Sequence, residues 1–201
     1  MSDGLNMLGK KAIALPYEQY FGEMGISEEQ KKKRIELAKQ LEELFIILFV
    51  LMRNSENIEE FDTETTEDRF FDALKKVGIN LTKKVKTLVI ERVEHIVDVT
   101  KRHMEDPWYL SDDRAKANAE EESGTFWNTI EFDDAMESGY TKKTWHTMLD
   151  DLVRGSHYEV EGDTIPIHEY FEVGDSLMMY PRDPNGEEEE IANCRCWLTY
   201  S

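Results

Sequence analysis

The stretch Gly139-Tyr-Thr-Lys-Lys-Thr-Trp-His-Thr-Met148 marks the point where the chain changes from a helical to a strand-like pattern. Before it, apolar residues recur at steps of three and four, which is the spacing of one helix face. From Thr144 onward, polar and apolar residues alternate as they do in a half-buried strand. The sequence therefore predicts the α+β class, with an N-terminal α-helical half followed by a small mixed α+β domain.

Downstream of this stretch, short strands are expected over residues 164–167, 176–180 and 194–200. Glycine and proline residues separate them as turns, and Gly162 is the clearest of these turn positions. Trp145 and Phe171 are expected to anchor the core of this half, because large aromatic side chains contribute most to burial.

Four helices are predicted upstream. Ser27-Glu-Glu-Gln30 has the form of a capping box, so a long helix is expected to follow it as far as about residue 53. Pro107 interrupts the helical pattern. We therefore expect a helical region over residues 1–106 and a second domain over residues 107–201. The other three helices are expected over residues 66–77, 81–103 and 112–138.

Residues 44–52 are apolar without interruption. A helical segment that is apolar on all sides must be covered, either by the core of the same chain or by another subunit. It is too short for a membrane span, since nine residues of helix rise only about 14 Å. As candidates for an interaction surface we name Leu44, Phe45, Leu48, Phe49 and Met52.

The chain is acidic, with a formal net charge of −19, and residues 107–201 carry seven Lys and Arg against 22 Asp and Glu. Such a surface repels phosphate backbones, so direct DNA binding by the C-terminal half is not expected. No stretch reaches the length of a membrane span, and no secretion signal precedes the first helix. We expect a protein that stays in the cytoplasm where it is made, with its two cysteines reduced.

His157, His168, Cys194 and Cys196 are the residues from which a zinc site could be assembled. The two cysteines stand only one residue apart, whereas zinc-binding cysteines are usually two to four apart. In an extended segment both would instead point to one face and pack as small apolar groups. The spacing favours core thiols, and no metal or cofactor is expected.

Asp150, Arg154 and His157 would lie close together if residues 149–157 were helical. A hydrogen-bonded structural cluster is the favoured interpretation, since a catalytic one needs a nucleophile beside the histidine. Arg195 is expected to point outward or to pair with an acid such as Asp150 or Glu169. The chain contains no phosphate-binding glycine-rich loop, no His-Glu-x-x-His and no Gly-x-Ser-x-Gly, so we expect no enzymatic activity.

An ordered set of residues resembles the C-terminal domain of phage head morphogenesis proteins, the minor capsid family that shares a domain with the F protein of phage Mu. Arg114, Glu122 and Asn128 precede the set. The chain departs from the family pattern at Arg154 and His157, where many relatives have cysteines, and at Glu190, where they have a histidine. The residues that stand in the family's order are Trp145, Asp150, Arg154, His157, Gly162, Phe171, Pro181, Asn193, Cys194, Arg195 and Cys196.

The resemblance implies a structural minor head protein of a tailed phage or prophage, located in the capsid interior or at the portal. It implies a role in procapsid assembly or DNA ejection, with portal or capsid proteins as partners and self-association as a further possibility. The protein would be found in the virion head, and in the host cytoplasm during assembly. Two alternatives stay open: a metal- or histidine-dependent enzyme or toxin-type domain, and a DNA-binding accessory head protein that uses the lysine clusters at 31–34 and 83–86.

Overall fold

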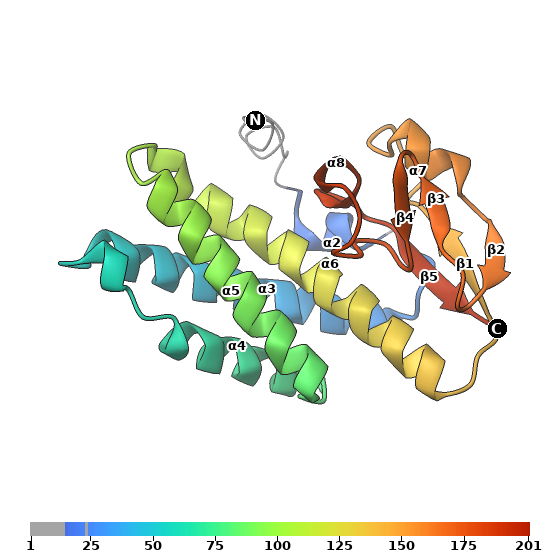
Figure 1. Cartoon of the computed structure of the whole chain (residues 1–201), viewed down its shortest axis with the longest axis horizontal. Helices are drawn as coiled ribbons and strands as arrows, with labels where there is room; N and C mark the ends of the chain where they lie inside the picture. Colours follow the sequence, from blue (N-terminus) through green and yellow to red (C-terminus); the bar gives the residue numbers. More distant parts are fainter. Residues whose placement is uncertain (1–14, 23) are drawn as a thin grey trace. The chain divides into compact units, whose positions relative to one another are not determined.

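The computed structural model describes residues 15–22 and 24–201, and these residues have the α+β architecture that the sequence predicts (Figure 1). They form two compact units, Lys32–Ser123 and Leu15–Lys31 together with Gly124–Ser201. We placed the boundary near residue 106, where proline interrupts the helical pattern. The division instead falls within two long helices, α3 (Glu28–Arg53) and α6 (Asp112–Glu137). Helix boundaries and unit boundaries therefore differ, because one helix can supply a buried face to two cores.

The first unit is helical. It contains most of α3, the first part of α6, and between them α4 (Glu64–Lys76) and α5 (Lys83–Arg102), with two 3₁₀ turns, η2 (Ile58–Glu60) and η3 (Pro107–Leu110). Helix α5 begins where Thr82 Oγ1 accepts a hydrogen bond of 3.2 Å from Val85 N, which satisfies one free amide of the first turn. Helices α4 and α5 pack against each other. The predicted helices all exist, with ends that differ by a few residues.

The apolar segment of α3 lies in the core of this unit. Phe45, on α3, packs edge-to-face with Phe70 of α4 at a ring-centroid distance of 6.3 Å. The guanidinium of Arg114, on α6, lies 4.9 Å from the ring centroid of Phe49. Our assignment of Leu44, Phe45, Leu48, Phe49 and Met52 to a docking surface is therefore wrong, because all five are buried. The apolar residues that α3 leaves exposed are Ile47, Val50 and Leu51.

The second unit contains two small antiparallel sheets. In the larger one, β1 (Lys142–His146) pairs with both β2 (Thr164–Pro166) and β5 (Trp197–Tyr200) (Figure 1). Within it, Trp145 lies opposite Leu198. The smaller sheet consists of β3 (Phe171–Val173) and β4 (Ser176–Met178). The sequence did not predict β3 or the short helices α2 (Tyr17–Tyr20), α7 (Gly155–Glu159) and α8 (Glu188–Ile191).

The core of the second unit forms around Trp145, as predicted. Its ring lies 5.1 Å from that of Phe171 and 5.8 Å from the imidazole of His157, both in edge-to-face geometry. Cys194 and Cys196 are buried in the same cluster. The alternation that predicted inward positions for these residues therefore identified the core correctly.

Gly124, in the second unit's part of α6, faces the buried side chain of Arg182. That guanidinium is held by hydrogen bonds from Nε to Cys194 O at 2.6 Å and from Nη2 to Tyr20 Oη at 2.9 Å. A methyl group at position 124 would come within 2.9 Å of Arg182 Nε. Because the guanidinium is fixed at both ends, it cannot move away without losing a hydrogen bond.

We therefore expect Gly124→Ala to destabilise the second unit by about 1–3 kcal/mol, the usual cost of overpacking. In an ordinary helix interior the same change stabilises by about 0.5–1 kcal/mol. A loss of stability would therefore by itself indicate the clash with Arg182. Gly155→Ala is the matched control, because a methyl group there meets nothing within 4 Å. Urea unfolding followed by tryptophan fluorescence measures both. A Gly124→Ala variant as stable as the parent would contradict the expected clash.

A buried histidine–cysteine cluster as the candidate functional site

Three donor side chains meet inside the second unit. His157 lies on α7, and Cys194 and Cys196 lie on the segment that leads into β5. His157 Nδ1 is 3.3 Å from Cys196 Sγ and 3.6 Å from Cys194 Sγ. The three donor atoms lie within 4.8 Å of one another, and all three residues are buried. His168, the fourth residue considered from the sequence, is exposed and does not belong to this group.

The local sequence brings the two cysteines to one side of the chain. Asn193 has φ of +55° and turns the backbone after α8. The next residues are extended and alternate, so Cys194 and Cys196 point inward while Arg195 lies between them on the other side. Arg195 Nη2 donates to Asp150 Oδ1 at 2.6 Å, which confirms one of the two expected pairings. The hydrogen bond from Arg195 lowers the pKa of Asp150.

Glu190 completes the surroundings of the histidine. Its Oε2 lies 3.0 Å from His157 Nε2 and accepts a hydrogen bond of 2.8 Å from Ser156 Oγ. The imidazole is therefore placed between a carboxylate on one nitrogen and two sulfurs on the other. The sequence contains Glu190 as the last of four successive glutamates, and nothing in that run singles out the one that meets His157.

The charges of the cluster are interdependent. Burial raises the pKa of Cys194 on its own, but hydrogen bonds with Cys196 and His157 outweigh it and bring the pKa well below the usual value. Burial and then Cys194 raise the pKa of Cys196 well above its usual value. For His157, burial lowers the pKa, but the interactions with Cys194 and Glu190 prevail and raise it. The surroundings therefore favour negative charge on Cys194 and positive charge on His157, and they disfavour a second negative charge on Cys196.

Residues 149–157 are not helical throughout: only α7 is a helix, and it begins at Gly155. Arg154 precedes it and donates through Nη2 to the carbonyl of Ala192, so it does not clamp Asp150. The cluster expected from helical spacing is thus replaced by two separate contacts: Asp150 with Arg195, and Arg154 with the backbone before the cysteines. Both hold the loop that carries α7 against the segment that carries the cysteines.

The remaining residues of the predicted set have structural roles. Gly162 has φ of +78°, and its amide donates to Trp145 O at 2.9 Å, so it forms the turn that the sequence predicts. Asn128 Nδ2 donates to the carbonyls of Pro181 and Cys196 at 3.1 and 3.2 Å. Because one amide joins α6 to two separate loops, it fixes the position of the cysteine segment on the helix.

A small pocket adjoins the cluster. His157, Cys194 and Cys196 all contribute to its lining. Arg154 and Arg195 also line it, and they bond to the carbonyl of Ala192 and to Asp150, respectively. The three donor residues are therefore buried and at the same time border a small space. The other residues that line it are Met148, Leu152, Val153 and Asn193.

Lys143, on β1, is another buried ionisable group of the second unit. Its Nζ donates to Met179 O at 2.7 Å and lies 5.0 and 5.2 Å from the ring centroids of Phe132 and Phe171. Burial lowers its pKa from 10.5 to about 8, while Asp183 acts in the opposite direction.

This pKa predicts a pH dependence of stability. Between about pH 8 and 10.5 the unfolded chain binds more protons at Lys143 than the folded chain, so the free energy of unfolding rises with pH. From about pH 7.5 to 9.5 we expect a rise of about 2 kcal/mol relative to a Lys143→Met variant, in which this titration is absent. Urea unfolding of both proteins at the two pH values measures the difference. If the free energy of unfolding changed equally with pH in both proteins, the expected lowering of the Lys143 pKa would be contradicted.

In comparisons with models of known protein families, with curated proteins and with solved structures, no match to this chain is found. Among the described residues, no helix combines the length and the apolar character that a membrane crossing needs. The functional argument therefore rests on the residues and their geometry.

Proposed function

We propose that this protein is a structural minor head protein of a tailed phage or prophage, associated with the portal or the capsid interior. The observation that carries the proposal is that the residues of the ordered set act together as the framework of one unit. Trp145, Phe171 and the two cysteines supply its core, Gly162 its turn, and Asn128 the link between helix and loops. A pattern of this kind specifies a fold, so its resemblance to the head morphogenesis domain is a resemblance between structural modules.

Charge supports a protein partner over DNA. Residues 107–201 carry 15 of the 19 net negative charges, which disfavours phosphate backbones and suits a basic protein surface. We place the protein in the host cytoplasm during assembly and in the virion head afterwards. Portal protein, capsid protein or a second copy of the chain are the partners, and procapsid assembly or DNA ejection is the process.

The test is sedimentation of the purified chain with the portal protein from the same genome. We expect the two to sediment together, and expect no association with the portal of an unrelated phage. If the chain sediments alone with the cognate portal and with the cognate capsid protein, the proposal fails. A salt-sensitive DNA shift that is lost when Lys83, Lys84 and Lys86 are neutralised would favour the DNA-binding alternative instead.

An enzyme is the second candidate, favoured by one observation: Cys194, His157 and Glu190 stand in the order of a thiol, a base and an orienting carboxylate. The burial of Cys194 argues against it, because only 3% of that residue is exposed and a substrate must reach the sulfur. Alkylation kinetics decide the matter. A catalytic thiolate would react rapidly with iodoacetamide in the folded protein, whereas we expect reaction only on unfolding.

A further inference from the structure

The arrangement of His157, Cys194 and Cys196 matches the dimensions of a tetrahedral metal centre. With metal–sulfur bonds of about 2.3 Å and metal–nitrogen bonds of about 2.0–2.1 Å, tetrahedral geometry places nitrogen and sulfur about 3.6 Å apart and two sulfurs about 3.8 Å apart. The observed nitrogen–sulfur distances are 3.3 and 3.6 Å, and the largest separation among the three atoms is within 4.8 Å. Small side-chain rotations therefore suffice to enclose an ion.

Without a metal, the three groups hydrogen-bond to one another, with Cys194 bonded to both Cys196 and His157. An imidazole nitrogen has either one proton or one lone pair, yet His157 Nδ1 faces two sulfurs at hydrogen-bond distance. The nitrogen can make a full hydrogen bond to one sulfur, and the other sulfur depends on its neighbouring cysteine. A cation at the centre would bind the nitrogen and both sulfurs at once, so it would satisfy all three buried groups.

Glu190 orients the histidine as metal sites require. Its carboxylate accepts the Nε2 proton, so when the imidazole gives up its other proton on metal binding, the lone pair that is freed is the one on Nδ1, facing the sulfurs. Ser156 fixes the same carboxylate oxygen. Gly174 leaves room for it, since a methyl group there would lie 2.3 Å from Glu190 Oε1. Carboxylate–histidine pairs of this kind set the tautomer and the ring orientation of metal-binding histidines.

We propose that His157 Nδ1, Cys194 Sγ and Cys196 Sγ bind a zinc ion, with Glu190 as the group that orients the histidine. Two sulfur ligands and one imidazole select zinc over magnesium or calcium, which prefer oxygen ligands. A water molecule entering from the adjoining pocket would supply the fourth ligand. This inference replaces our expectation of core thiols without metal, which rested on the spacing of the cysteines and gave no weight to His157. It does not depend on the role in the phage head.

The first experiment uses the wild-type chain alone. Protein purified under reducing conditions is stripped with a chelator and titrated with cobalt(II), which reports on zinc sites by its colour. We expect saturation at one equivalent, a sulfur-to-cobalt charge-transfer band in the near ultraviolet, and the strong visible absorption of tetrahedral cobalt. Zinc should displace the cobalt and abolish both bands. Absence of the charge-transfer band at saturating cobalt overturns the proposal, whatever the variants do.

The second experiment assigns the ligands by competition for zinc with a chromophoric chelator. We expect His157→Ala, Cys194→Ser and Cys196→Ser each to lose stoichiometric binding. Glu190→Gln should keep one equivalent but bind it about 10–100-fold more weakly, as orienting groups do. His168→Ala is the matched control and should bind as the wild type does. Zinc binding that survives His157→Ala at full affinity would overturn the ligand assignment, even if the cysteine variants fail to fold.

Discussion

Replacing Phe45 with glutamate is expected to unfold the helical unit. The side chain of Phe45 is fully buried on α3 and packs on Phe70 of α4. Truncation of such a ring to alanine costs about 3–5 kcal/mol. A carboxylate at this position adds the cost of an unpaired buried charge. The total loss is then comparable to the whole free energy of unfolding of a typical domain, about 5–15 kcal/mol. Far-ultraviolet circular dichroism should show a large loss of helix at 25 °C.

Ile47→Glu is the matched control for this variant. Ile47 is two residues away on the same helix and is 40% exposed, so the same charge enters water there. We expect its helix content to stay at the wild-type level and its free energy of unfolding to change by less than about 0.5 kcal/mol. If both variants remained folded, Phe45 would not be part of the core. Unfolding of both would mean that the exposed face of α3 is covered by something other than this chain's own helices.

Local signals in the sequence predicted most of the helices correctly. The capping box is present: Gln30 N donates to Ser27 Oγ at 3.2 Å, and Ser27 N donates to Gln30 Oε1 at 3.0 Å. Such signals work because a helix end is satisfied by residues three or four positions away. The strands were predicted where alternation extends over several residues, and β3 was missed because three residues carry too little of the pattern.

Competition between local interactions explains why residues 149–157 are not helical throughout. Residues 149–157 have apolar and polar residues at helical spacing, yet the helix begins only at Gly155. Asp150 Oδ1 accepts a hydrogen bond of 3.1 Å from Leu152 N, and Leu149 has φ of +54°. An aspartate that binds the backbone two residues on stabilises a turn in place of a helix. The periodic pattern alone does not reveal which of the two interactions prevails.

The candidate site was predicted only in part, because its geometry depends on long-range contacts. His157 meets Cys196 across 39 positions of sequence and Glu190 across 33. The cysteine spacing is visible in the sequence, but the approach of α7 and α8 to the two cysteines is not. The spacing of the donors in the chain suggested no metal, whereas their spacing in space fits one. Spacing along the chain is a poor guide to such a site when the donor side chains come from two segments that are far apart in sequence.

Removing the carboxylate of Glu122 is expected to be nearly as damaging to the helical unit as a defect in its core. Glu122, on α6, accepts hydrogen bonds from Arg92 of α5 at 2.6 Å from Nη2 and at 2.9 Å from Nε. The glutamate side chain is 2% exposed and the arginine side chain 24% exposed. The ion pair with Glu122 raises the pKa of Arg92, so the guanidinium stays charged at every accessible pH.

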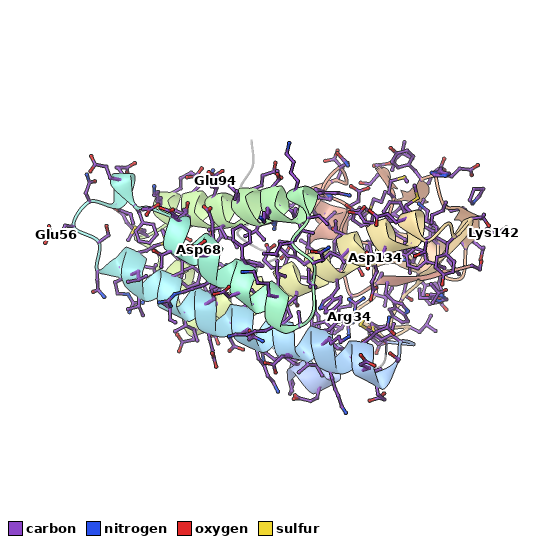
Figure 2. The ribbon with its side chains drawn as sticks, turned by 90° about the horizontal axis from the view of Figure 1, so that it is seen from below. Arg34, Glu56, Asp68, Glu94, Asp134 and Lys142 are labelled. Carbon is purple, nitrogen blue, oxygen red and sulfur yellow. The ribbon has the colours of Figure 1, made fainter. Side chains whose placement is uncertain are left out.

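We therefore expect Glu122→Leu to destabilise the unit by about 3 kcal/mol, at the lower end of the range for breaking a buried ion pair, because Arg92 retains some access to water. The reason for the loss is the unpaired cation that remains, so the double variant Arg92→Leu with Glu122→Leu should recover most of the stability. Glu94→Leu is the control, since Glu94 lies on the outer side of α5 in contact with solvent (Figure 2). Urea unfolding of the wild type, the two single variants Arg92→Leu and Glu122→Leu, and the double variant yields the coupling energy of the pair. A double variant no more stable than Glu122→Leu would show that the loss comes from the packing of residue 122 and not from the charge left on Arg92.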